Sequence, residues 1–298
     1  MKRGKNDIPI IAGIGEILWD VLESSEELGG APVNFAFHAG ALGAEAYAIS
    51  TVGDDDRGKA ALEELRQRKV SIEHITVMPG ATTGYVLAQV DSEGVAAYTF
   101  PDNVAWDRIQ IHDKTRNLAG RLDAICFGSL AQRSDISRVA ITDYLKNVQQ
   151  TTLKVLDLNL RQQFYTSEII KDSLKLADVL KLNDDEILHI AEMEHLKGSD
   201  ESKLKMLVER YGLQLAALTR GGQGSLLVSA AQVSNHPGYQ AEVVDTIGAG
   251  DSFTAATILG LLKGYSLDEI NDHANRVAAF VCSQKGAMPA LPDDCRIY

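Results

Sequence analysis

The sequence has 298 residues, of which 45% are hydrophobic, so it can bury a sizeable core in one large α/β domain or two smaller ones. Its net charge of −12 argues against nucleic acid or an anionic membrane as the main partner. No uncharged apolar stretch is long enough to span a bilayer, and the basic start shows no signal-peptide cleavage pattern. Cys126, Cys282 and Cys295 lie far apart without metal-ligand spacing, so we expect a cytoplasmic protein.

The first seventy residues predict alternating strands and helices. Ile8–Ile14 is a near-continuous apolar run, typical of a strand buried on both faces. Glu16–Glu23 alternates instead, which predicts a strand at an edge or outside the main sheet. Pro32 favours the first turn of a helix that extends to about Leu42. Ala46–Val52 then predicts a strand and Gly58–Arg68 a helix.

A β-hairpin follows, and it predicts a second, smaller sheet. Its strands are Thr83–Val90 and Val95–Phe100, and Asp91–Gly94 forms the turn, which Gly94 allows. Together with the Glu16 region, these strands can build a small sheet separate from the main one.

The rest of the chain continues the alternation, which implies a three-layer, Rossmann-like α/β fold with a mostly parallel sheet. A glycine-rich hairpin, Gly221–Gly224, separates two of the later strands. The predicted strands are Asp123–Phe127, Lys154–Leu158, Ala177–Leu182, Leu213–Thr219 and Leu226–Ser229, and the predicted helices are Ser134–Gln149, Ser252–Lys263 and Leu267–Cys282.

The loop Asp245–Phe253 carries the strongest chemical signal. It joins a β-type run, Ala241–Val244, to a helix that starts near Asp251. Its small residues Gly248–Gly250 let backbone approach a ligand, and the N–H groups at a helix N-terminus bind phosphate. A carboxylate cannot hold phosphate, but Asp251 could take a proton from an attacking hydroxyl, with a basicity lowered by the helix end. Alternatively, Asp251 only caps the helix.

Two nucleotide motifs are incomplete. Gly53–Lys59 fits the first seven positions of a Walker A loop, but Ala60 lacks the hydroxyl that would bind magnesium. Gly13 and Gly15 begin a dinucleotide fingerprint, but Leu18 replaces the third glycine. Neither segment predicts a nucleotide site.

Two further polar groups follow predicted strands. Asp157, Asn159 and Arg161 have a spacing of two, so in an extended chain all three point one way, unless the aspartate and arginine form a surface pair. Asn183 and Glu186 lie one helical turn apart and face the same side, as a ligand pair or as the N-cap and closing residue of a capping box.

The loop Asp245–Phe253 closely resembles the C-terminal signature of the ribokinase-like (PfkB) carbohydrate kinases. Four other segments resemble that family's motifs in the family's order: Gly29–Asn34, Val52–Gly58, Asn183–Glu186 and Thr219–Gly224. The pattern Gly15-Glu16-x-Leu18-x-Asp20, together with Gly29–Pro32 and Asp157–Arg161, is similar to the fructokinase branch.

The resemblance implies one ribokinase-like kinase domain over residues 1–298, with a β lid formed from about 16–28 and 83–101. It implies an ATP-dependent sugar kinase that phosphorylates a primary hydroxyl, most simply converting D-fructose to fructose 6-phosphate. Asp251 would be the base, and Gly248, Ala249 and Gly250 would stabilise the phosphoryl oxygens. The expected sugar-binding residues are Asp20, Gly29, Gly30, Asn34, Tyr98, Phe100, Asp157, Asn159 and Arg161. Tyr98 and Phe100 alternate onto one face, where they could equally belong to the core or to a dimer contact.

The same resemblance assigns the nucleotide and ion sites. Glu186 and Asn183 would hold Mg²⁺ through water beside the phosphates. Asp245, Ile247 and the loop Ser283–Gly286 match a monovalent-cation site, for K⁺, whose ligands are mostly backbone carbonyls. The expected ATP-binding residues are Asn183, Thr219, Gly221, Gly222, Gly224 and Asn275.

Other substrates and a non-enzymatic function remain alternatives. A 2-keto-3-deoxygluconate kinase needs a cation for the substrate carboxylate, which Arg133 or Arg161 could supply. Ribokinase is a further alternative, whereas no large apolar pocket for a nucleoside is evident. A sugar-binding regulatory protein that has lost catalysis would be expected to lack Asp251 or the glycine loop. An exposed β lid also predicts a homodimer that pairs through two lids.

Overall fold

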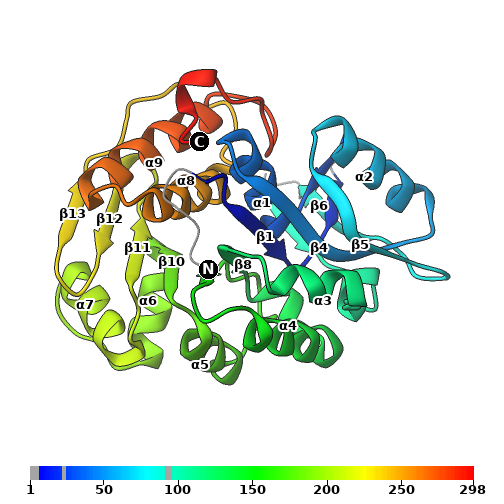
Figure 1. Ribbon diagram of the computed structural model, residues 1–298, viewed down its shortest axis with the longest axis horizontal. Coiled ribbons are helices and arrows are strands. Elements are labelled where there is room, and N and C mark those ends of the chain that lie inside the picture. Colours follow the sequence, from blue (N-terminus) through cyan, green and yellow to red (C-terminus); the bar gives the residue numbers. More distant parts are fainter. Residues whose placement is uncertain (1–6, 22–24, 91–95) are drawn as a thin grey trace.

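The computed structural model describes residues 7–21, 25–90 and 96–298 and contains two β-sheets (Figure 1). In this described part, the main sheet has nine strands in the order β13-β12-β11-β10-β9-β8-β1-β4-β5. All neighbours from β11 to β5 pair in parallel, whereas β12 and β13 are antiparallel additions at one edge. The predicted α/β class with a mostly parallel sheet is therefore confirmed.

The strands of the main sheet are short and mostly apolar. β1 is buried along its whole length, because helices cover both faces of the parallel sheet. The strands are β1 Ile10–Ile14, β4 Glu45–Gly53, β5 Ser71–Met78, β8 Ala124–Phe127, β9 Leu153–Asp157, β10 Val179–Asn183, β11 Leu215–Thr219, β12 Ser225–Val228 and β13 Val233–His236.

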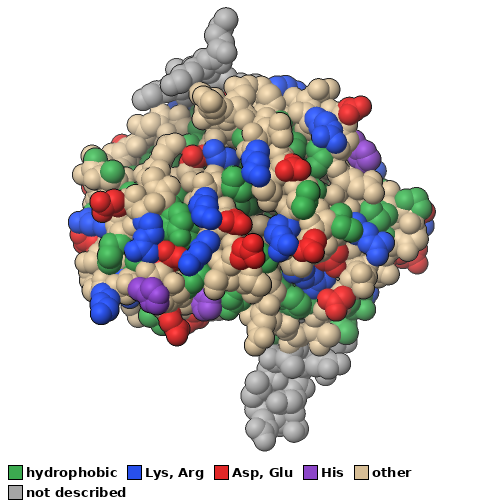
Figure 2. All heavy atoms as spheres, turned by 90° about the horizontal axis from the view of Figure 1, so that it is seen from below, with side chains coloured by type: hydrophobic (Ala, Val, Ile, Leu, Met, Phe, Trp, Pro, Cys, Tyr) green, Lys and Arg blue, Asp and Glu red, His purple; other side chains and the backbone are tan. Residues whose placement is uncertain are grey.

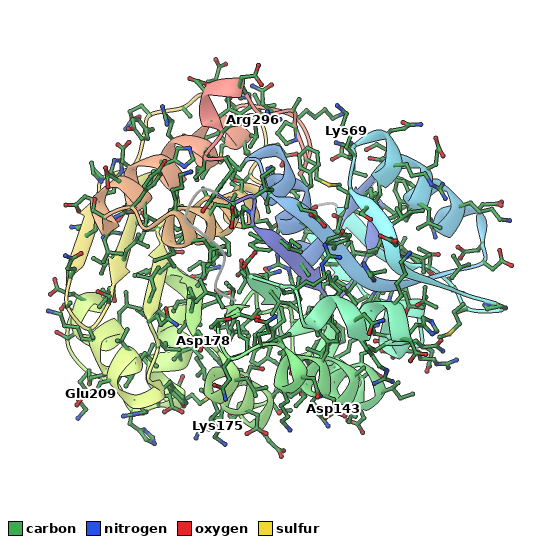
Figure 3. All side chains as sticks on the ribbon, viewed as in Figure 1. Lys69, Asp143, Lys175, Asp178, Glu209 and Arg296 are labelled. Atoms are coloured by element: carbon green, nitrogen blue, oxygen red, sulfur yellow. The ribbon has the colours of Figure 1, made fainter. Side chains whose placement is uncertain are left out.

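Helices form a layer on each face of the sheet. One layer contains α1 (Ala31–Ala41), α2 (Asp56–Gln67), α8 (Ala249–Lys263) and α9 (Leu267–Cys282), and their apolar side chains pack on one set of strand residues. The opposite layer packs on the alternate set, and charged residues such as Asp143, Lys175 and Glu209 project outward from it (Figure 3). The helices of this layer are α3 Asp113–Ala119, α4 Asp135–Asn147, α5 Ser167–Leu176, α6 Asp184–Met193 and α7 Asp200–Tyr211.

The second sheet is the predicted lid, with four strands in the order β3-β2-β6-β7 among the described residues. β2 (Leu18–Val21) pairs antiparallel with β3 (Glu26–Gly29) and parallel with β6 (Gly84–Val90), and β7 (Ala96–Thr99) completes the hairpin. The Glu16 region thus leaves the main sheet, as predicted. The predicted turn Asp91–Gly94 and residues 22–24 lie outside the described residues.

Two features of the surface bear on partners. Figure 2 shows Lys and Arg side chains interspersed with Asp and Glu over one face of the molecule, without a large patch of one sign. Within the described ranges, every helix is too short or too polar to cross a bilayer.

One predicted strand is wrong. Ala241–Val244 forms no strand, and Val243 and Val244 are 64% and 61% exposed. Its β-branched residues suit a strand, but no strand of the described residues pairs with them. The segment is instead held at its end, where the N–H groups of Val244 and Asp245 both donate to the carbonyl of Cys282.

Candidate active site

A cavity of about 380 Å³ lies between the lid and the carboxyl ends of the parallel strands. The lid contributes Leu18, Asp20 and Val86 to its wall, and Phe100 follows the last lid strand. The opposite wall comes from strand ends and from the loop Asp245–Phe253. Its residues are Asn159, Arg161, Lys181, Asn183, Thr219, Thr246, Ile247, Gly248, Gly250 and Asp251. Ligands bind at this edge in open α/β sheets.

Asp251 lies in the first turn of α8 and lines the cavity together with Gly30 and Asn34 of the segment Gly29–Asn34. Asn34, on α1, donates a hydrogen bond of 2.8 Å from Nδ2 to Asp251 Oδ2. Gly248 precedes the helix with φ +79°, and a Cβ there would lie 2.2 Å from the carbonyl oxygen of Ala287. Only glycine therefore fits at the turn where α8 begins, beside the cavity.

Burial raises the pKa of Asp251 to about 7, and the nearby Asp157 carboxylate acts in the same direction. The Asn34 hydrogen bond and the charges of Lys181 and Arg161 lower the pKa but do not outweigh these causes. The sequence-based expectation that the helix end would lower the basicity of Asp251 is therefore wrong. A carboxylate with a pKa near neutral pH suits a general base.

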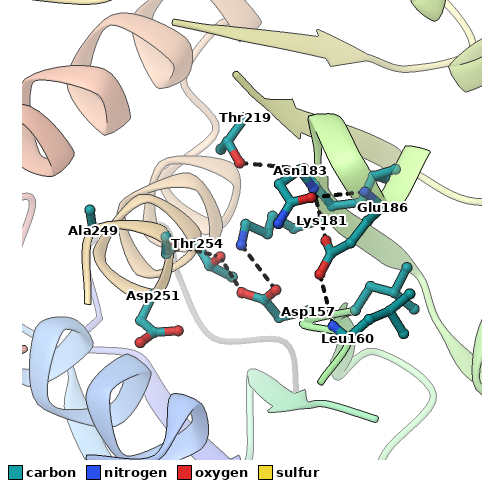
Figure 4. A network of polar contacts seen from close by, with 12 residues as sticks. Asp157, Leu160, Lys181, Asn183, Glu186, Thr219, Ala249, Asp251 and Thr254 are labelled. Atoms are coloured by element: carbon teal, nitrogen blue, oxygen red, sulfur yellow. Dashed lines mark hydrogen bonds and ion pairs between the residues drawn. The ribbon is translucent and has the colours of Figure 1, made fainter. Parts of the chain in front are cut away.

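Lys181 forms a buried network that the sequence analysis missed (Figure 4). Its Nζ donates to Asp157 Oδ1 at 3.1 Å, and Thr254 Oγ1 lies 3.1 Å from Asp157 Oδ2. Burial lowers the pKa of Lys181, but the carboxylates of Asp157, Glu186 and Asp251 outweigh this and raise it. A single lysine inside an apolar strand was the signal that could have revealed the network.

The segment after β9 does not stay extended. Asn159 has φ +40° and Gln162 has φ +46°, so the chain turns twice and the predicted common direction is wrong. Asp157 is 3% exposed and pairs with Lys181, so it forms no surface pair with Arg161. Asn159 and Arg161 line the cavity, whereas Asp157 is absent from its wall.

Asn183 and Glu186 form the capping box of α6. Asn183 Oδ1 accepts from the N–H groups of Asp185 and Glu186, and Glu186 Oε2 accepts from Asn183 N at 2.8 Å. Glu186 Oε1 also accepts from Leu160 N at 2.8 Å. Burial raises the pKa of Glu186, although Lys181 opposes this.

This capping limits how a metal ion can bind. Asn183 lines the cavity, while Glu186 lies behind it with both oxygens engaged. The described residues contain no cluster of three acidic, histidine or cysteine ligands. The pair therefore fits a hydrated Mg²⁺ held through water, the form in which Mg²⁺ usually joins substrate phosphates.

The segment Thr219–Gly224 begins at Thr219, which lines the cavity, and turns into the antiparallel strand β12. A Cβ at Gly221 or Gly222 would meet open space, whereas one at Gly224 would lie 2.1 Å from His236 O. Asn275 is buried and does not line the cavity. Its Nδ2 donates to Ser225 Oγ and to the carbonyl of Asn271, each at 2.7 Å.

The lid end of the cavity is acidic. Burial raises the pKa of Asp20 to about 6, and burial also raises the pKa of Glu16, which the sequence analysis did not include in the site. Gly29 and Gly30 pass close to these residues, since a Cβ there would lie 3.0 Å from Asp20 Oδ2 and 2.4 Å from Glu16 O, respectively.

The two aromatic residues of the lid lie in different surroundings. Phe100 lines the cavity and packs edge-on against Phe164, with 5.4 Å between ring centroids. Tyr98 is 54% exposed and does not line the cavity. The predicted common face for the two rings is therefore wrong in this structure, and only Phe100 is positioned to contact a ligand in the cavity.

The expected monovalent-cation loops do meet. Asp245 Oδ1 accepts from Ile247 N at 3.0 Å, and Asp245 Oδ2 accepts from Gly286 N at 3.0 Å. The carboxylate thus holds the two loops together through its own hydrogen bonds, which leaves any cation to backbone carbonyls.

Arg133 is bound by residues that do not line the cavity. Its Nε and Nη2 each donate to the carboxylate of Asp107 at 2.9 Å, and its guanidinium lies 4.1 Å from the ring centroid of Trp106. It does not line the cavity, so it cannot supply the cation for a substrate carboxylate.

The chain is similar to carbohydrate kinases in both sequence and fold. Residues 15–294 match the model of the pfkB family carbohydrate kinases. An uncharacterized sugar kinase from Pyrococcus horikoshii, also solved in complex with ATP, has a TM-score of 0.82 and 29% identity over 94% of this chain and 93% of its own. A fructokinase from Klebsiella pneumoniae is 29% identical over 94% of this chain and 95% of its own length. A Vibrio cholerae fructokinase solved with fructose, ADP and calcium has a TM-score of 0.80 at 20% identity over 96% of each chain.

Proposed function

The chain belongs to the PfkB family of carbohydrate kinases, and on this basis we propose that its substrate is D-fructose, phosphorylated by ATP at the 6-hydroxyl. The supporting observation is the polarity of the lid end of the cavity, which Glu16, Asp20 and Asn34 line. Carboxylate and amide oxygens accept hydrogen bonds from neighbouring hydroxyls, so this end suits a neutral sugar.

The distribution of positive charge supports the same substrate. Among the described residues that line the cavity, the cations are Arg161 and Lys181, and Lys181 is paired with Asp157. A phosphorylated or carboxylated substrate would place its charge beside acidic groups with Arg161 as the main counter-charge. Fructokinases among the relatives agree with a neutral hexose.

In the proposed phosphoryl transfer, each bond that forms is matched by a bond that breaks. The fructose 6-hydroxyl loses its proton to Asp251 as its oxygen bonds to the γ-phosphorus. The bond from that phosphorus to the bridging oxygen breaks, and ADP leaves. The N–H groups of Gly248–Gly250 hold the phosphoryl oxygens, and the lid excludes water. Mg²⁺, when bound, neutralises charge on the phosphates.

The remaining contacts extend this proposal. Asp20, Gly29, Gly30 and Asn34 hold the sugar, with Phe100, Asn159 and Arg161 nearby. Thr219 and the glycines at 221, 222 and 224 contact ATP, while Asn275 supports their loop. K⁺ binds at the Asp245–Ile247 loop. We place the reaction in the cytoplasm, in agreement with three free cysteines, and assign residues 1–298 to one domain that dimerises through its lid.

The test is ADP release from MgATP with fructose, ribose, 2-keto-3-deoxygluconate, adenosine or no sugar. We expect turnover with fructose far above the blank, and higher kcat/KM than with any other substrate. Arg161 lines the cavity and makes 2-keto-3-deoxygluconate the second candidate, so a preference for that acid would replace fructose. A sugar that raises the melting temperature without turnover would instead support a binding protein.

A further inference from the structure

We propose that Lys181 is the cation that contacts the transferring γ-phosphoryl group, and that Asp157 is its positioning residue and does not bind the sugar. This inference rests on the proposed kinase function and assigns one more group to the same site. Asp157 was expected to contact the sugar, and Lys181 belongs to none of the motifs that carry the resemblance.

The sheet itself places the pair. β10 lies between β9 and β11, and Lys181 is directly opposite Asp157 in the parallel register. Residues opposite each other in neighbouring strands point to the same face, so the two side chains must meet. Their side chains are 10% and 5% exposed, which makes this a buried ion pair.

Lys181 also reaches the loop that is expected to hold phosphate. A Cβ added at Gly250 would lie 2.9 Å from Lys181 Nζ, so the ammonium group lies against the first turn of α8. Lys181 lines the cavity together with Gly248, Gly250 and Asp251. Figure 4 shows the Lys181 side chain extending toward Asp157 and α8. An ammonium at this place can donate to a phosphoryl oxygen while Asp157 accepts another of its protons.

The carboxylates around Lys181 explain why a cation is needed at this place. Asp157, Asp251 and Glu186 all act electrostatically on Lys181. Without the lysine, three carboxylates would repel the phosphate that must approach Asp251. A buried, fixed charge of this kind stabilises charge that develops in the transition state without reorganisation.

Both carboxylate oxygens of Asp157 already have partners inside the protein, and the residue is buried and absent from the cavity wall. Oδ1 accepts from Lys181 and Oδ2 from Thr254 Oγ1, and Thr254 Oγ1 also lies 2.9 Å from the carbonyl oxygen of Gly250. The carboxylate therefore ties the lysine to the first turn of α8. Its role is to direct the ammonium group toward the phosphoryl position.

The test compares the double variant D157N/K181Q with D157N alone and with D20A. The double variant removes both charges, so it leaves no unpaired buried ion. We expect kcat to fall by about 10²–10³-fold in the double variant and about 10-fold in D157N. The KM for sugar should stay within about 3-fold in both, whereas D20A should raise it far more.

Binding gives a second readout that does not need turnover. Calorimetry with the non-hydrolysable analogue AMP-PNP and with ADP separates a γ-phosphate contact from general nucleotide binding. We expect the double variant to lose affinity for AMP-PNP only. Equal losses for both nucleotides, or none, would overturn the contact between Lys181 and the γ-phosphate, even if the wild-type protein turned over no sugar in the panel.

Two further results would overturn the proposal. A sugar KM in D157N as high as in D20A would make Asp157 a sugar ligand. If the double variant does not fold, K181R replaces it: its larger guanidinium cannot occupy the space against Gly250, so kcat should fall at unchanged sugar KM. An unchanged kcat in K181R would contradict the assigned position.

Discussion

At the scale of single residues, the chemistry depends on how the fold changes the proton affinity of two carboxylates. Asp251 and Asp20 both lie in the cavity wall, and burial raises their pKa values to about 7 and about 6. A buried charge costs free energy unless it is fully paired. Both side chains therefore keep their protons up to pH values at which an exposed aspartate is ionised.

Replacing Asp251 by asparagine tests the base. D251N keeps the shape of the side chain and can still contact Asn34, so binding of sugar and ATP should persist. Turnover should fall about 10³-fold or more, because the hydroxyl proton has no acceptor. Kinetics together with calorimetry check this, with exposed Asp143 changed to asparagine as the control. Weak binding with unchanged turnover would remove Asp251 as the base.

The same pKa values predict opposite effects of pH on activity and stability. The acid limb of kcat/KM should fall as pH drops through about 7, because protonated Asp251 cannot act as a base. A raised folded-state pKa stabilises the protein fully below the unfolded pKa, and this is lost as pH rises through the folded value. Between pH 5 and 8, ionisation of these two groups should therefore lower the unfolding free energy of the ligand-free protein by on the order of 4 kcal/mol.

Urea unfolding at several pH values measures this effect. D251N should be more stable than the wild type at pH 8 and show a flatter pH dependence. If stability fell equally with pH in both proteins, the raised pKa of Asp251 would be refuted.

At the scale of elements, the start of α8 is fixed by the loop that follows α9 rather than by side chains of α8 itself. The carbonyl of Ala287 lies over Gly248, and the buried His38 Nε2 is 2.9 Å from that same carbonyl oxygen. The loop after α9 thus holds the turn that begins α8. No side chain caps this helix end, and the N–H of Ala249 lies 3.4 Å from the carbonyl oxygen of Thr246, which is the long limit of a hydrogen bond.

Gly248→Ala should disrupt this arrangement. The new Cβ would require a positive φ and would lie 2.2 Å from a clamped backbone oxygen. We expect a loss of about 2 kcal/mol or more in unfolding free energy and a larger fall in kcat than in sugar affinity. Gly120→Ala is the matched control, because its nearest contact would be 3.8 Å. Equal stability of the two variants would contradict the close approach at Ala287.

Sequence patterns predicted most elements around the site because buried strands leave a local apolar signal. The helix Leu267–Cys282 has the predicted bounds. The patterns gave wrong predictions where pairing with another segment determines the structure: Ala241–Val244 has strand-forming residues, but it pairs with no strand in the described part of the chain. The bend at Asn159 and the pairing of Lys181 with Asp157 depend on the neighbouring strand, which no local spacing encodes. Strands β5 and β13 and helices α3, α5 and α7 were not predicted.

At the scale of the whole molecule, the two sheets are joined by a buried cluster around Arg133. Trp106 lies under the lid, where a Cβ at Gly84 would be 2.1 Å from its Nε1. Arg133 stacks on Trp106, pairs with Asp107 and donates to the carbonyl of Pro101, just after the lid. The cluster thus ties the segment after β7 to the main domain, in addition to the ion pairs that Glu26 and Glu27 of the lid form with Arg57 and Lys285.

Removing one partner of this pair should be costly. R133A leaves Asp107 buried and unpaired, so we expect a loss of about 3–5 kcal/mol in unfolding free energy. R133A/D107A should recover part of that loss. The exposed pair Lys175 and Asp172 is the control, and K175A should cost less than about 1 kcal/mol. Denaturant unfolding measures the three variants. If R133A and K175A lost similar unfolding free energy, the cluster would not be an anchor of the lid.

The hydrogen bond between Asn34 and Asp251 spans 217 positions of the chain. Loops of this length close slowly, because their entropy is lost before their contacts form. Individual helices can form long before this contact does. During refolding, the helical signal should therefore recover ahead of catalytic competence, and the interval between them would time the final assembly of the site.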